Sequence, residues 1–199
     1  MESAPASRAF SLAWLMGLAF SHNRAAAIVA FPVALMTIVA CMLRRGVYAT
    51  RDRNGMVILV RWSPLADIIA ACVIITLTYV AIGVVAAVAF LAWVPLGLII
   101  VGTSVLWILA GAVIFASGAQ TLSPVCEATP EGLGRWHVSA LAQRPGTRLS
   151  ALLLLRQLVG AVPPGHVLVA SAGSDDLLNN YVRLGFTSGS KRRVFKILG

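Results

Sequence analysis

Residues 68–126 read IIAACVIITLTYVAIGVVAAVAFLAWVPLGLIIVGTSVLWILAGAVIFASGAQTLSPVC and contain no charged side chain. This gap between Asp67 and Glu127 is 59 residues long. One crossing of a bilayer takes about 20 apolar residues, so the gap has room for two crossings and a turn. A soluble core helix rarely runs so far without a charge, and we therefore predict an integral membrane protein.

The rest of the chain agrees with this class, because 59% of its residues are hydrophobic and only 12% are charged. Soluble domains carry about twice that share of charge. Three transmembrane helices are expected, over residues 25–43, 66–91 and 96–118. Residues 92–95, Ala-Trp-Val-Pro, predict a tight turn between the last two, because proline removes a backbone donor and tryptophan favours the membrane interface.

A shorter apolar run covers residues 10–20 and is too short to cross a bilayer alone. It fits an interfacial amphipathic helix within an N-terminal segment of residues 1–24. The alternative is a fourth membrane helix, in which the run forms half of a hairpin with the span at 25–43. The first reading is the expected one.

Arginine placement predicts the orientation of the spans. The loop at 44–65 holds five arginines against one aspartate before Asp67, and the chain after residue 119 holds seven arginines and two lysines. Positive residues stay on the cytoplasmic side, so we expect a multi-pass protein of the cell inner (plasma) membrane with a cytoplasmic C-terminal domain. The net charge of +9 is assigned to this pattern and to contact with the lipid bilayer. No nucleic-acid partner is expected, since basic and aromatic residues do not interleave.

The cytoplasmic loop has the pattern of a β-hairpin. Residues 47–50 and 56–60 are rich in strand-forming side chains, and Arg53-Asn54-Gly55 between them predicts the turn, because Asn-Gly tolerates positive φ. After a linker at 119–133, the chain from 134 to 199 alternates strand-like and helix-like segments. The expected order is strand 136–142, helix 148–161, strand 166–170, helix 175–184 and strand 191–197. This order is typical of a small α/β domain.

The segment Asn180-Tyr181-Val182-Arg183-Leu184-Gly185-Phe186 looks like the closing helix and Tyr-x-x-x-Gly-Phe ending of the GNAT family of acyl-CoA-dependent N-acetyltransferases. The strand at 136–142, followed by Arg144-Pro145 and a Leu-rich helix, is similar to the cofactor-binding motif of that family. The resemblance covers about residues 134–198. It implies a bacterial membrane-anchored acetyltransferase that carries an acetyl group from acetyl-CoA to an amine.

The resemblance also implies roles for single residues. Gly146, Thr147, Arg148 and Ala151 match the cofactor-binding loop and helix start, where backbone N–H groups hold a pyrophosphate. Tyr181 matches the catalytic tyrosine that protonates the leaving thiolate, against the simpler interpretation of a packed core tyrosine. Ala151 and Leu153 both depart from the family pattern, which has glycine at the first of these positions and glycine or alanine at the second. No spacing of histidine and cysteine suggests a metal site.

Two other functions stay open. The family's N-terminal half, with further strands and two helices, is absent or replaced by the membrane spans and the hairpin at 47–60, which could add strands to the sheet. These departures favour a catalytically inactive scaffold or subunit of a membrane complex, with membrane-protein partners or a homo-oligomer. A transporter or channel is the weakest reading, because no ionisable residue lies in the middle of a span.

Overall fold

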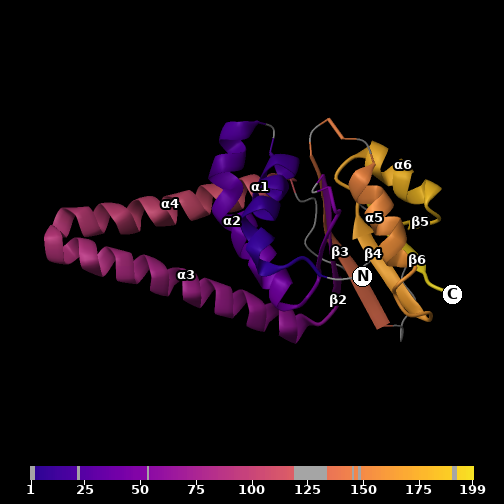
Figure 1. Ribbon diagram of the computed structural model, residues 1–199, viewed down its shortest axis with the longest axis horizontal. Helices are drawn as coiled ribbons and strands as arrows, with labels where there is room; N and C mark the ends of the chain where they lie inside the picture. Colours follow the sequence, from indigo (N-terminus) through magenta and orange to yellow (C-terminus); the bar gives the residue numbers. More distant parts are fainter. Residues whose placement is uncertain are drawn as a thin grey trace.

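The computed structural model describes residues 3–21, 23–52, 54–118, 134–144, 146–147, 149–189 and 192–199, with the side chains of 115–118 left aside. Figure 1 shows a sheet with helices on both faces and, projecting from it, a long pair of helices. The chain therefore combines a sheet module with a helical hairpin.

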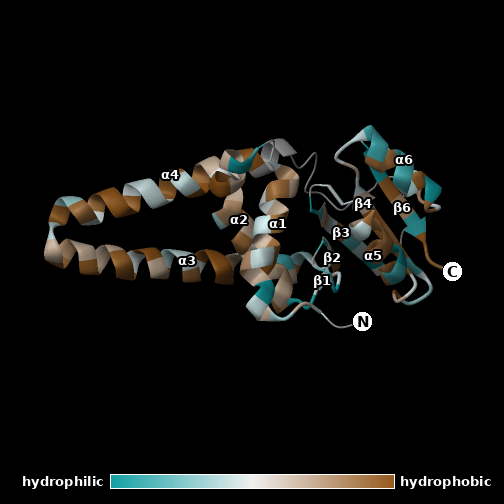
Figure 2. Ribbon diagram, turned by 45° about the horizontal axis from the view of Figure 1, so that its top comes forward, coloured by the Kyte–Doolittle hydropathy of each residue, from teal (hydrophilic) through white to brown (hydrophobic). Residues whose placement is uncertain are grey.

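The hairpin consists of α3 (Pro64–Ala92) and α4 (Val94–Gly118), joined at Trp93. The backbone of Trp93 is extended, and its N–H donates to the carbonyl of Ala89, so the break predicted at residues 92–95 is confirmed. Together with α2 (Arg24–Leu43), which continues through Pro32, these are three helices long and apolar enough to cross a membrane. Figure 2 shows that hydrophobic residues predominate along α3 and α4.

The N-terminal helices form a layer between the hairpin and the sheet (Figure 1). A short 3₁₀ turn, η1 (Ala6–Arg8), leads into α1 (Ala9–Phe20), and α2 follows after a short connection. α1 packs along α2 on one side and contacts the sheet on the other. The side chain of Asn23 caps α2 by accepting from the N–H of Ala26. The apolar run at 10–20 thus pairs with the expected first span, and its place at a membrane interface stays a prediction.

Six strands form one mixed sheet in the order β1-β2-β3-β4-β6-β5. All neighbours are antiparallel except β3 and β4, which are parallel. The connecting helices are α5 (Ser150–Val159) and α6 (Asp175–Arg183). The strands are β1 (Val47–Ala49), β2 (Gly55–Arg61), β3 (Gly134–Gln143), β4 (His166–Ser171), β5 (Thr187–Ser188) and β6 (Arg193–Ile197).

The expected hairpin at 47–60 is confirmed, and it belongs to the same sheet as the C-terminal strands. β2 pairs with β3 along its whole length, from Gly55 opposite Gln143 to Arg61 opposite Trp136. The sheet module is therefore not confined to residues 134–199. The helical hairpin is an insertion between two strands that lie side by side.

The connection between β1 and β2 differs from the expected Asn-Gly turn. It runs from Thr50 to Asn54, with Arg53 outside the described residues. The hydroxyl of Thr50 accepts from the N–H of Gly55 at 3.0 Å, and Asp52 accepts from the N–H of Asn54 at 3.2 Å. These bonds replace the tight-turn geometry, and Gly55 lies in the strand instead.

Two hydrophobic cores lie on opposite faces of the sheet. One face carries α5 and α6, with Leu155, Leu158 and Tyr181 fully or almost fully buried. The other carries α1 and α2, with Ala13 and Ile38 fully buried. The helices of the two halves of the chain therefore cover opposite sides of one sheet, as in an α/β layer.

Candidate ligand cleft at the diverging strands

The parallel strands β3 and β4 pair over the first half of β3 and over all of β4 except its last residue. Their pairing ends at Val138 opposite Ala170, whereas β3 continues to Gln143 with β2 as its partner. Alternate backbone groups of a strand point to opposite neighbours. Part of the backbone of residues 139–143 therefore faces the side that β4 has left.

A β-bulge marks the point of divergence. The register between β2 and β3 shifts between Ile58 and Leu59, opposite Ser139. Before the bulge, Val138 belongs to the core under α5 and α6, whereas Ala140 belongs to the core under α1 and α2. The bulge thus turns β3 as it leaves β4, as bulges near binding sites commonly do.

A hollow of about 260 Å³ lies at this end of the sheet. Four elements line it: α1, the end of β3, the start of α5 and α6. Most of its lining is apolar, and Gln143 and Asn180 supply two side-chain amides. The lining residues are Ala19, Leu141, Gln143, Leu149, Leu152, Leu177 and Asn180. Ligands of open α/β sheets bind outside the carboxyl ends of parallel strands, so the hollow is the best candidate site among the described residues.

The turn before α5 adjoins the hollow, and Leu149 at its end is one of the lining residues. Gly146 and Leu149 have positive φ values of 86° and 62°, which is unusual for a leucine. Thr147 donates to the carbonyl of Arg144 through both its N–H and its hydroxyl. This places the predicted residues Gly146 and Thr147 in the turn that leads to the hollow, although neither lines it. Arg148, the third predicted residue, lies outside the described residues.

Ala151, the fourth residue predicted for the cofactor, is fully buried. It lies against the tip of the β1–β2 hairpin, where a methyl group added to Gly55 would come within 2.7 Å of the amide nitrogen of Ala151. The hydroxyl of Ser150 donates to the carbonyl of Asn54 at 3.2 Å. The side chain of Ala151 therefore helps to seat α5 on the hairpin and has no exposed surface for a ligand.

Tyr181 is a residue of α6, and its side chain lies in the hydrophobic core with 1% of the residue's surface exposed. Its ring packs against Phe186 at 5.3 Å between centroids, and Phe186 follows Gly185, whose φ of 80° ends the helix. Burial raises the pKa of Tyr181, so the hydroxyl keeps its proton. Tyr181 is adjacent to Asn180 and one turn after Leu177, and both of these line the hollow.

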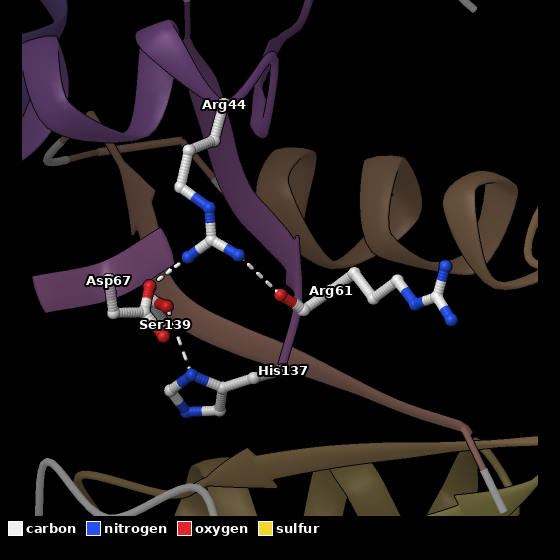
Figure 3. A network of polar contacts seen from close by, with 5 residues as sticks. All are labelled: Arg44, Arg61, Asp67, His137 and Ser139. Carbon is white, nitrogen blue, oxygen red and sulfur yellow. Dashed lines mark hydrogen bonds and ion pairs between the residues drawn. The ribbon is translucent and has the colours of Figure 1, made fainter. Parts of the chain in front are cut away.

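A second group of polar residues lies at the base of the helical hairpin (Figure 3). Arg44 pairs with Asp67, and its other terminal nitrogen donates to the carbonyl of Arg61 at 2.6 Å. The hydroxyl of Ser139 lies 3.0 Å from Nδ1 of His137. Burial lowers the pKa of His137 to about 4, so its imidazole is neutral at pH 7. Asp67 is engaged by Arg44, and we assign this group a structural role.

Sequence reasoning missed most of the residues that line the hollow. Asn180 lies in the segment 180–186 that resembles the family ending, but the sequence predicted a functional role for its neighbour Tyr181. Ala19 lies more than 120 residues away from the other lining residues in the sequence, and no local pattern marks it. Gln143 is the last residue of β3, and a polar side chain at the end of a buried parallel strand is the signal that could have identified it.

No protein-family model matches the chain, and no curated protein matches its sequence. Among the residues that the structure describes, no group of three histidine, cysteine, aspartate or glutamate side chains is placed to hold a metal ion. The geometry of the hollow is therefore the basis on which a function is proposed.

Proposed function

We propose that this chain is a membrane-anchored acetyltransferase-like protein that binds acetyl-CoA and transfers its acetyl group to an amine. The observation that carries the proposal is the hollow at the point where β3 and β4 diverge. A thioester placed there has on one side the part of β3 that runs beyond its pairing with β4. The turn and first residues of α5, with the positive end of the helix dipole, lie on the other side.

The chemistry needs few side chains. A neutral amine attacks the thioester carbonyl, and backbone N–H groups in residues 139–143 that face away from β2 stabilise the oxyanion that forms. The carbon–sulfur bond then breaks, the thiolate takes a proton from the Tyr181 hydroxyl, and the proton that the amine nitrogen releases as the amide forms restores that hydroxyl. Because burial raises the pKa of Tyr181, that hydroxyl carries its proton at neutral pH.

The strands of the sheet and the helices that cover it support the resemblance in sequence to the GNAT family. The expected family half with further strands and two helices has counterparts here: β1 and β2 extend the sheet, and α1 and α2 cover one face. Ala19 of α1 reaches the hollow. In the proposal, α1 shapes the acceptor side, and the acceptor is an amine on a lipid or membrane protein, because the anchor raises its local concentration.

Titration calorimetry of the purified full-length protein in detergent tests the binding step. Acetyl-CoA is expected to bind with a dissociation constant in the micromolar range, about −8 kcal/mol, and adenosine monophosphate serves as the control. Absence of acetyl-CoA binding by a folded sample would overturn the proposal.

One observation favours a second function, a binding scaffold that keeps the fold without catalysis. Tyr181 is not among the residues that line the hollow, and its ring is packed in the core. Tyr181→Phe separates the two. As an acid, the tyrosine is worth about 100-fold in kcat, so the variant loses acetyl transfer while it keeps acetyl-CoA affinity. In a scaffold, the wild type transfers no acetyl group and the variant co-purifies with the same membrane partners.

A further inference from the structure

We infer that α3 and α4 are the helices that cross the bilayer, and that α2 lies along the membrane surface with both of its ends on the side of the sheet. Sequence alone leaves the side of the N-terminus open, because α2 has the length and composition of a span. The inference concerns membrane topology and does not depend on acetyl-CoA binding.

The first step comes from the N-terminus, which is attached to the sheet. The N–H of Ala4 donates to the carbonyl of Val47 in β1 at 2.8 Å. The chain then enters α1, which has 12 residues and is therefore about 18 Å long. The hydrocarbon core of a bilayer is about 30 Å thick. α1 starts on the sheet side and is too short to cross, so α2 also starts on that side.

The end of α2 returns to the sheet. Gly46, just after the helix, accepts a hydrogen bond from the N–H of Leu59 in β2 at 2.8 Å. Within α2, Ala34 and Ile38 share a core with Met56 and Ile58 of β2. A sheet with open edges is not stable in hydrocarbon, because its backbone groups would lose their partners. The second half of α2 therefore lies at the depth of the sheet and not in the middle of the bilayer.

The contacts of α2 with the hairpin place it across the base. A methyl group added to Gly111, near the end of α4, would lie 2.7 Å from the carbonyl oxygen of Val29 and 3.1 Å from a methyl of Val33. At its other end, Arg44 pairs with Asp67 in the first turn of α3. α2 thus connects the two sheet-side ends of the hairpin. Figures 1 and 2 both show α2 running across the long direction of α3 and α4.

Exposure separates the same helices. In α3 and α4 only 11% of the most apolar window is buried, against 22% in α2. Bulky apolar side chains of the hairpin face outward along its whole length, from Leu65 to Leu91 in α3 and from Val94 to Val113 in α4. Such a surface matches lipid chains as its partner. α2 instead has neighbours in α1, α3 and α4.

The charges agree with an in-plane α2. Arg24 is its first residue, and Arg44 and Arg45 follow its last turn. If α2 crossed the membrane, the two groups of arginines would lie on opposite sides, against the rule that positive residues stay on one side. With α2 along the surface, both groups lie at the level of the same lipid phosphates.

Single-cysteine labelling tests the topology in the full chain. The native cysteines are replaced by Cys41→Ala, Cys72→Ala and Cys126→Ser, and one exposed site is then introduced per variant: Ser7→Cys, Arg51→Cys, Ser188→Cys or Trp93→Cys. A membrane-impermeant maleimide is applied to sealed vesicles of each orientation. We expect residues 7, 51 and 188 to label from one face with at least tenfold preference, and residue 93 to label from the other.

Two results would overturn the inference. Labelling of residue 7 from the face opposite to residue 51 would show that α2 crosses the bilayer. Labelling of residue 93 from the same face as residue 51, or from neither face, would show that the hairpin does not cross. Acetyl-CoA binding by the same cysteine-free protein reads out the proposed function separately, since the topology and the cleft can fail independently.

Discussion

The guanidinium of Arg44 at the end of α2 pairs with the carboxylate of Asp67 in the first turn of α3. This contact joins the layer formed by α1 and α2 to the base of the helical hairpin (Figure 3). The second terminal nitrogen of Arg44 donates to the carbonyl of Arg61, the last residue of β2. One side chain therefore connects three elements at the place where the chain leaves the sheet and enters α3.

Removal of this pair is expected to loosen the base of the hairpin. The side chain of Arg44 is 16% exposed and that of Asp67 is 42% exposed, so water partly screens the attraction. We expect a coupling free energy of up to about 1 kcal/mol. A double-mutant cycle with Arg44→Gln and Asp67→Asn, followed by thermal unfolding in detergent, measures it. Additive losses from the two variants would show that the pair contributes nothing.

A substitution at Gly55 tests the contact between α5 and the β1–β2 hairpin. In Gly55→Ala, the new methyl group meets the amide nitrogen of Ala151 at 2.7 Å, and this neighbour is backbone that cannot turn away. Overpacking of this kind costs about 1–3 kcal/mol, so the unfolding midpoint should fall. Gly173→Ala is the matched control, because a methyl group there meets nothing within 4 Å. Equal midpoints for the two variants would contradict the contact.

Leu152 and Leu153 give a matched pair for the hollow. Leu152 lines it, whereas Leu153 points outward with 56% of its surface exposed. Leu152→Trp fills part of the 260 Å³ space and is expected to weaken acetyl-CoA binding at least tenfold, or about 1.4 kcal/mol. Leu153→Trp should leave the affinity unchanged. Calorimetry measures the acetyl-CoA affinity of both variants. A loss of affinity only in Leu153→Trp would show that the ligand binds outside the hollow.

Because of His137, the folded protein is expected to lose stability in mild acid. Burial lowers its pKa to about 4, whereas an unfolded chain has a histidine pKa of about 6.5. Between these values the unfolded state binds more protons than the folded state, so the free energy of unfolding falls as pH decreases from 6.5 to 4. The loss is at most about 3 kcal/mol.

Comparison of pH profiles isolates the contribution of His137. His137→Gln should flatten the decrease in unfolding midpoint between pH 6.5 and 4. His166→Gln keeps the buried imidazole and should retain the wild-type profile. A profile for His137→Gln as steep as that of the wild type would assign the acid effect to other groups.

The local elements followed from the sequence alone. Long uncharged runs predicted α2, α3 and α4 within about two residues of their ends, because composition and length set such helices without help from the rest of the chain. The alternation after residue 134 predicted β3, α5, β4, α6 and β6 in their order for the same reason, and missed the two-residue strand β5. Pairing of β1 with β2 followed from two strand-like runs close together in the sequence.

Other features depended on contacts between distant residues. The pairing of β2 with β3 joins strands on either side of the inserted helices α3 and α4, and the bulge at Ser139 sets which face each residue of β3 takes. Those contacts bury Ala151 under Gly55 and bring Ala19 to the hollow beside Asn180. They also hold α2 against the sheet, although its composition alone predicts a span. Local pattern determined which elements form. Burial between elements decided which surfaces remained exposed, because burial depends on what packs nearby and not on sequence neighbours.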